Sequence, residues 1–385
     1  MIPRVRLLIS LWFIGAEGLV VLNSGSAADT CVSMVQHYLQ HALPQYATSA
    51  GKINHLLQHR LATLAEYSAQ AAPELANVRG YFTVAAKIEQ SSRLLTPKSL
   101  QDIEAIVERL AIPTLVLKGF AYTHDLYPEP RLRLHSDVDL LVAPEHRFIA
   151  HQALIAMGFQ CAAMSVFHNN TSEALYLGKA AGDGASLAID LHWQLSASYA
   201  LYGRFDFDRL LAGAQKFDYS SLLKLGPVDA LIHSTVHYLS DAAAERSDVS
   251  LLDTALLFLA LDATEHEQLL STAKSMEVGA IVSLVLQTSN ARFGYSVPRD
   301  LLKQLESDPA GRRLRQLILN RHRHPFVLWP FFSGWPWHQA IRFTCVQIFP
   351  PRAYMDARYG LQSSLLHRHL LRSFRGLKRL FHGRY

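Results

Sequence analysis

The sequence predicts an α+β protein in which a small sheet lies between helical segments. Apolar residues recur at helical spacing up to residue 112 and again from residue 201 onward. Between these regions the pattern changes to short apolar runs bounded by Gly and Pro, which is typical of strands. The 385 residues are 50% hydrophobic and only 18% charged, so a sizeable core is expected and disorder is not.

Residues 1–33 form an apolar N-terminal segment with more than one interpretation. A basic start, the apolar run 7–16 and the small residues 26–28 are typical of a signal peptide. Glu17 interrupts the apolar stretch, and the candidate cleavage site lies far downstream of the run. These features favour a packed helix, or a start codon assigned upstream of the native one, over export. No stretch of about 20 apolar residues occurs, so no conventional spanning helix is expected.

The region 34–112 is expected to be helical. Residues 52–65 and 99–110 both show apolar residues at i, i+3 and i+4. Pro113 cannot continue the second helix, because it lacks a backbone N–H. The apolar face of this second helix is expected to consist of Ile103, Ile106, Val107 and Leu110.

Residues 113–200 are expected to form the α/β core. Short apolar runs predict strands, and Pro and Gly mark where the intervening helices begin and end. Two further runs flank the Gly-rich segment 180–184 and predict a hairpin. The expected elements are strands at 114–117 and 136–142, helices at 120–127 and 144–158, and hairpin strands at 174–178 and 186–193.

Helical spacing returns in residues 201–350, most clearly at 227–239 and 251–260. His233 and His237 lie four apart on the first of these helices. They are expected to pack, because the acid of a HisGluXaaXaaHis metal motif is absent between them.

Basic charge is concentrated in the tail, residues 351–385. From Arg352 onward eight Lys and Arg stand against Asp356, a net charge of +7 that leaves −2 on the other 351 residues. This balance argues against an extensive nucleic-acid groove. On a helical wheel the tail is amphipathic, which fits an anionic membrane surface or a helix docked on its own domain. The apolar side consists of Leu366, Leu370, Phe374, Leu377 and Phe381, and the basic side of Arg368, Arg372, Arg375 and Arg379.

Three carboxylates lie in apolar strands. Asp137 and Asp139 are two apart and therefore face the same side of a strand, where they repel one another unless a cation or a proton intervenes. If the strand of Asp190 joins the same sheet, the three acids can hold two Mg²⁺ ions about 3.5–4 Å apart. The alternative is that the pair caps a helix or binds Arg131 or Arg133.

The order of these motifs resembles the uncharacterised bacterial nucleotidyltransferases of the DNA polymerase β superfamily. The resemblance is carried by LeuValLeuLysGly, then ArgLeuHisSerAspValAspLeuLeuVal, then a helix ending MetGlyPhe, then IleAspLeuHisTrp, and it covers roughly residues 100–200. It implies a small mixed nucleotidyltransferase sheet with flanking helices. Residues 113–200 would be its core, between the helical regions 34–112 and 201–350.

The resemblance also implies roles for particular residues. Asp137, Asp139 and Asp190 correspond to the family's catalytic, metal-binding acids, with Asp190 also placed to take the proton of the acceptor hydroxyl. Nucleotide-binding positions match at Lys118, Gly119, Arg133 and His192. The expected reaction moves an NMP group from an NTP, with ATP the expected donor, to an acceptor hydroxyl and releases pyrophosphate, with Mg²⁺ as cofactor.

One departure from the wider superfamily leaves a second function open. Most members place GlySer after the first strand to hold the triphosphate, whereas Lys118, Gly119 and Phe120 stand here without a hydroxyl. The alternative is therefore a weakly active or inactive nucleotide-binding regulatory module. The amphipathic tail separately suggests a membrane-associated adaptor. Three scattered cysteines indicate buried thiols in a reducing compartment, so a cytoplasmic location is expected. A second possibility is a cytoplasmic protein that also contacts the inner membrane face through residues 361–385.

Overall fold

The computed structural model describes most of the chain, from α1 to the start of the tail. The described residues are 27–42, 48–70, 72–91, 100–162, 171–179, 186–196, 198–218, 220–240, 247–320, 337–359, 364, 366–370 and 372. Most of the predicted N-terminal segment and most of the amphipathic tail lie outside these residues. Within them, every helix is too short or too polar to cross a membrane.

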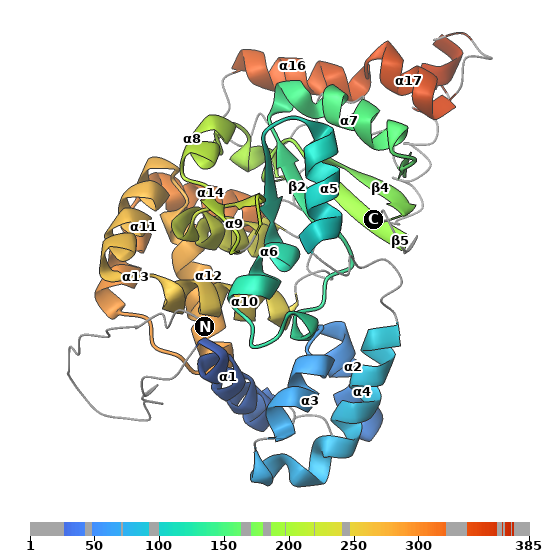
Figure 1. Cartoon of the computed structure of the whole chain (residues 1–385). Helices are drawn as coiled ribbons and strands as arrows, with labels where there is room; N and C mark the ends of the chain where they lie inside the picture. The colour runs from blue at the N-terminus through green and yellow to red at the C-terminus, as the bar shows by residue number, and fades with distance from the viewer. Residues whose placement is uncertain are drawn as a thin grey trace. The chain divides into compact units, whose positions relative to one another are not determined.

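The α+β fold is confirmed, with a mixed sheet of seven strands in the order β3-β4-β5-β2-β1-β7-β6. The central pair β2 and β5 is parallel, as is the pair β1 and β7, whereas β3–β4, β4–β5 and β6–β7 are antiparallel. Figure 1 shows β2, β5 and β4 side by side. The strands are β1 (Thr114–Leu117), β2 (Val138–Val142), β3 (Gln160–Cys161), β4 (Glu173–Lys179), β5 (Ser186–His192), β6 (Gln215–Lys216) and β7 (Leu223–Lys224).

Burial explains why these segments are strands. Every residue of β1 and β2 is buried, as expected for central strands covered on both faces. In β4 burial alternates, so that Ala174 and Tyr176 point into the core while Leu175 and Leu177 remain 36% and 39% exposed. The predicted hairpin is confirmed, because β4 and β5 pair along their whole length.

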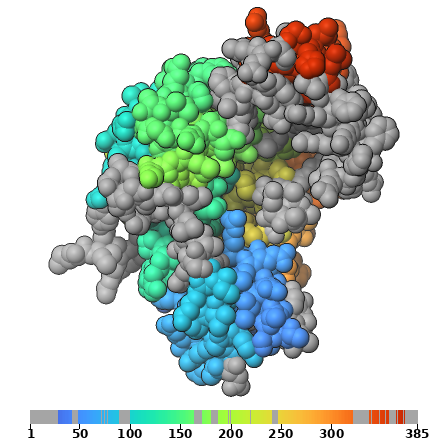
Figure 2. Space-filling model, turned by 90° about the vertical axis from the view of Figure 1, so that its right-hand side faces the viewer, coloured from blue at the N-terminus to red at the C-terminus, as the bar shows by residue number. Residues whose placement is uncertain are grey.

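The chain divides into two compact units, which are described separately. The helical unit comprises Met1–Leu94, Leu117–Ser136 and Leu225–Arg313, and the sheet unit comprises Leu95–Val116, Asp137–Lys224 and Leu314–Tyr385. In the helical unit, α2 and α4 pack together and α10 packs against α9 and α12. The blue and light-blue side chains of α2 and α4 form one continuous surface in Figure 2.

The helices follow the predicted pattern along the chain. The helices of the helical unit are α1 (Ala27–Ala42), α2 (Ser49–Gln58), α3 (Ala62–Gln70), α4 (Arg79–Ser91), α6 (Lys118–Asp125), α9 (Pro227–Ser240), α10 (Asp248–Ala260), α11 (Ala263–Ser275), α12 (Gly279–Phe293) and α13 (Arg299–Glu306). Those of the sheet unit are α5 (Leu100–Leu110), α7 (Arg147–Ala156), α8 (Phe207–Ala212), α16 (Trp337–Ile348) and α17 (Arg352–Tyr359), while α14 (Pro309–Leu319) crosses the division.

Two local expectations need correction. The single helix expected at 52–65 is two helices, because Arg60 adopts a left-handed conformation (φ 56°) and ends α2. Leu61 then donates its N–H to the carbonyl of Leu56, the hydrogen bond that closes such a helix end. In α5, Ile103, Ile106 and Leu110 are buried as predicted, but Val107 is only half-buried.

Candidate functional site

Strand register brings two of the predicted acids together. In the parallel pair β2 and β5, Asp139 lies opposite Asp190 and Leu141 lies opposite His192. Residues directly opposite one another on neighbouring strands project from the same face of the sheet. Asp139, Asp190 and His192 therefore share one face of the sheet unit, although Asp139 and His192 are 53 residues apart in sequence.

His192 lies between carboxylates. Its Nε2 is 2.9 Å from Oδ1 of Asp139 and 3.4 Å from Oδ2 of Asp190, and its Nδ1 is 3.0 Å from Oε2 of Glu173. An imidazole ring has two nitrogens pointing in different directions, so it fixes carboxylates on both sides. His192 consequently orients Asp139 while it is itself held by Glu173.

Exposure increases from Asp139 towards β4. The Asp139 and His192 side chains are 10% and 3% exposed, whereas those of Asp190 and Glu173 are 20% and 43% exposed. On the same face Leu175 lies opposite Asp190 in the β4–β5 pair and is itself exposed. Solvent and ligands can therefore reach the acids from the side of β4.

Glu173 was not predicted as a site residue. The sequence contains a signal for this residue. If the hairpin turns at residues 180–184, a residue near position 173 lies opposite His192 on the neighbouring strand. The predicted hairpin strand began one residue later, at Ala174, and so left the carboxylate out.

Asp137 lies immediately before the strand rather than in it. β2 begins at Val138, and Asp137 is a half-buried residue of the preceding bend. Asp139, Asp190 and His192 each offer a ligand atom within 4.8 Å of the other two, and Asp137 is not part of this set. The regular strand thus begins one residue later than the pairing of Asp137 with Asp139 assumed, and the joint metal site of the two remains a prediction.

The donor set of this cluster fits a divalent cation held by oxygen atoms. Asp139 and Asp190 supply carboxylates from neighbouring strands, the ligand type that Mg²⁺ prefers. His192 already contacts both acids and Glu173, which suits a residue that positions the ligands behind a metal.

A cleft of about 320 Å³ opens beside the ends of β2 and β5 in the sheet unit. Leu141, which pairs with His192, lines it together with Trp193, the residue after β5. Tyr202 and Phe205 add aromatic surface to the lining. Aromatic and apolar walls with a few polar groups are typical of pockets that hold small molecules, although Asp139, Asp190 and His192 do not line this cleft.

In the helical unit, Lys118 and Gly119 begin α6 directly after β1. Lys118 has a positive φ of 48°, a conformation that costs a residue with a Cβ of the order of 1 kcal/mol. A Cβ on Gly119 would lie 3.2 Å from Cβ of His135 and 3.5 Å from the terminal nitrogens of Arg133. Glycine thus permits close packing here, because a larger residue would require His135 to shift slightly.

Arg133 is a buried partner of Asp253 rather than a free cation. Its Nη2 and Nε lie 2.7 and 2.9 Å from the two carboxylate oxygens, and Nη1 donates to the carbonyl of Leu134. Tyr127 donates its hydroxyl to the same carboxylate at 2.6 Å. Burial alone lowers the pKa of Arg133, but the Asp253 carboxylate outweighs it and holds the pKa above its ordinary value. Asp253 therefore forms an ion pair within the helical unit.

The paired histidines of α9 are packed side chains. His233 is fully buried, and its ring lies 5.9 Å from that of His237 in an edge-to-face arrangement. Neither belongs to a group of three metal-binding side chains among the described residues.

Comparison with known families agrees with the geometry. A family model described as "Uncharacterised nucleotidyltransferase" matches residues 53–294, well over half of the chain. The chain therefore belongs to this nucleotidyltransferase family. No curated protein and no solved structure matches it.

Proposed function

We propose that this protein transfers an NMP group from an NTP, with ATP as the expected donor, to an acceptor hydroxyl and releases pyrophosphate. The observation that supports this most is the alignment of Asp139 with Asp190 on neighbouring parallel strands, with His192 beside both. The family match supports a nucleotidyltransferase in general terms.

In the proposed reaction the acceptor oxygen forms a bond to the α-phosphorus, and the bond from that phosphorus to the β-phosphate oxygen breaks. The acceptor proton passes to a carboxylate, for which Asp190 is the candidate because it is more exposed than Asp139. Mg²⁺, when bound, supplies charge neutralisation for the phosphates.

Asp139 and Asp190 would hold this cation, and Asp137 would join them from the bend before β2. His192 would keep the Asp139 carboxylate in one orientation through its Nε2, while Glu173 fixes the ring through Nδ1. The ring is thus proposed to act through Asp139 rather than on the nucleotide.

Lys118 and the amide of Gly119 remain the proposed contacts for the triphosphate, on the strength of the sequence resemblance. Backbone amides at the start of a helix and a lysine are suitable partners for phosphate. For Arg133 the ion pair with Asp253 favours a different role, that of holding the segment that leads to Asp137.

A nucleotide-binding module without transferase activity is the second candidate. It is favoured by the replacement of GlySer with Lys118 and Gly119, which removes a hydroxyl from the phosphate site. Membrane contact would add to either function. In the described part of the tail Leu366 and Leu370 are 71% and 60% exposed, which supports an apolar outer side. Arg368 was predicted to lie on the exposed basic side of the tail helix. It is instead buried and paired with Asp356. A cytoplasmic location remains the expectation.

The test is an assay with ATP labelled in its α-phosphate. The purified chain is added with Mg²⁺ to an extract fractionated into small molecules and macromolecules, and both pyrophosphate release and label transfer are measured. The transferase proposal requires both, and the fraction that takes up label identifies the acceptor class. Saturable ATP binding with neither signal would favour the binding module.

A further inference from the structure

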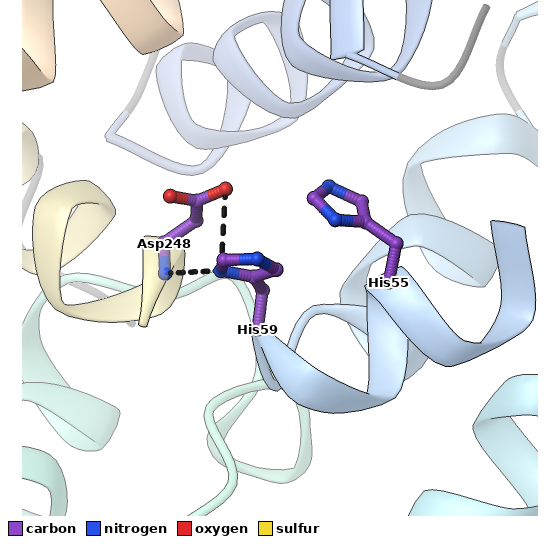
Figure 3. A group of neighbouring side chains, drawn as sticks. All are labelled: His55, His59 and Asp248. Atoms are coloured by element: carbon purple, nitrogen blue, oxygen red, sulfur yellow. Dashed lines mark hydrogen bonds and ion pairs between the residues drawn. The ribbon is translucent and has the colours of Figure 1, made fainter. Parts of the chain in front are cut away.

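The helical unit contains a second group of side chains with the chemistry of a metal site. His55 lies in α2, His59 directly follows α2, and Asp248 is the first residue of α10 (Figure 3). One ligand atom of each lies within 4.8 Å of the other two. None of these residues has a part in the proposed transfer.

Local backbone structure brings the three side chains together. His55 and His59 are four residues apart, so they lie on the same face of α2, and their ring centroids are 4.4 Å apart. The left-handed turn at Arg60 ends the helix there. The carbonyl of His59 then accepts the N–H of Val249 at 3.3 Å, which fixes the start of α10 against the end of α2.

The separation of His59 and Asp248 matches that of two ligands around one small ion. Nδ1 of His59 lies 3.4 Å from Oδ2 of Asp248. Two ligands of a tetrahedral zinc ion, each at a bond length of about 2.1 Å, are about 3.4 Å apart. The Tyr38 hydroxyl donates a hydrogen bond to the same Oδ2 at 2.7 Å and lies 2.6 Å from Nε2 of His55, so it links His55 to Asp248 and would exchange these hydrogen bonds for a bond to the ion.

The surroundings of the three side chains combine burial with one neighbouring cation, Arg292. Burial, and for His55 also the neighbouring His59, lowers the pKa of His55 to about 4 and lowers the pKa of His59. Arg292 lies 3.4 Å from Oδ1 of Asp248, the oxygen other than the one that faces His59.

We propose that His55, His59 and Asp248 bind one divalent transition-metal ion, zinc being the ion that best fits them, with Tyr38 at the fourth position. Two imidazoles and a carboxylate favour zinc over Mg²⁺, which prefers oxygen ligands. The ion takes up the lone pair of His59 Nδ1 that now accepts the Asp248 amide at 3.1 Å. It joins α2 to the start of α10, so its role is structural and independent of nucleotidyl transfer.

The test is zinc binding by the full-length chain. Protein stripped with a chelator is titrated with Zn²⁺ in excess Mg²⁺, which occupies oxygen-ligand sites, and affinity is measured by competition with a chromophoric chelator. One zinc ion per chain is expected. His59→Gln should weaken binding by on the order of 100-fold or more. Asp139→Asn, at the other cluster, and His338→Gln, at an exposed histidine, serve as matched controls and should bind as the wild type does.

A second measurement uses only the wild-type chain, so a folding defect in a variant cannot obscure the result. Diethylpyrocarbonate modifies accessible neutral histidines, and peptide mass spectrometry locates the modification. Zinc should protect His59, whose side chain is 17% exposed, and leave His338 reactive. Absence of stoichiometric zinc binding, equal affinity in His59→Gln, or no protection of His59 would overturn the proposal.

Discussion

The buried acids of the two units are surrounded by different partners. In the helical unit Asp253 is bound by Arg133 and Tyr127, so its charge is neutralised inside the protein. In the sheet unit Asp139 and Asp190 have His192 beside them, and exposure increases from Asp139 to Asp190. A permanent cation makes an acid a structural element, whereas a histidine orients an acid and leaves it able to bind a further cation.

The largest expected effect tests the sheet unit. Asp139→Asn should lower kcat/KM for nucleotidyl transfer by on the order of 1,000-fold or more, because an amide is a poor metal ligand and carries no charge. Steady-state release of pyrophosphate measures it. Asp300→Asn, at an exposed acid of α13, is the control and should retain full activity. Wild-type turnover by Asp139→Asn would mean that this acid is not a metal ligand.

Asp190→Asn should lower transfer by roughly 100- to 1,000-fold, the range expected for loss of a general base. Binding of Mg²⁺–ATP, measured by calorimetry, should change much less, because Asp139 keeps its carboxylate. Equal losses of binding and transfer would show that Asp190 serves the same purpose as Asp139 and takes no proton.

The matching experiment in the helical unit concerns stability. Arg133→Met should lower the free energy of unfolding by about 3 kcal/mol, because it leaves the Asp253 carboxylate buried without its cation. Urea denaturation followed by circular dichroism measures it. The double variant with Asp253→Leu should recover part of the loss. If Arg133→Met instead left stability unchanged and abolished ATP binding, the predicted phosphate contact would be correct.

Glu173→Gln should have the smallest effect, about a 10-fold loss of kcat/KM, since the side chain acts on Asp139 only through His192. The pH profile of the reaction provides the second readout, because the substitution removes a negative charge 3.0 Å from the His192 ring. A Glu173→Asp variant that restores the profile would support the positioning role. An unchanged rate and an unchanged pH profile would show that Glu173 has no part in positioning His192.

Much of the sheet unit could be predicted because its signals are local. The apolar runs of β1, β2 and β5 are bounded by turn residues, and strand periodicity places Asp190 and His192 on one face of β5. The contact of His192 with Asp139 spans 53 residues and depends on β2 and β5 being neighbours, which no local pattern specifies. Arg133 and Asp253 are 120 residues apart, and His59 and Asp248 are 189 apart. The turn at Arg60 was also missed, because arginine at a left-handed position gives no signal of the kind that glycine gives.

The parallel register of β2 and β5 has a consequence for how this sequence can vary in length. Side chains alternate between the two faces of a strand, so a single inserted or deleted residue between Ser186 and Asp190 would turn both Asp190 and His192 to the opposite face. An insertion or deletion of two residues would keep Asp190 and His192 on the same face. It would, however, place a residue other than Asp190 opposite Asp139. Functional relatives should therefore have no gaps within β5, and length differences should fall before Ser186.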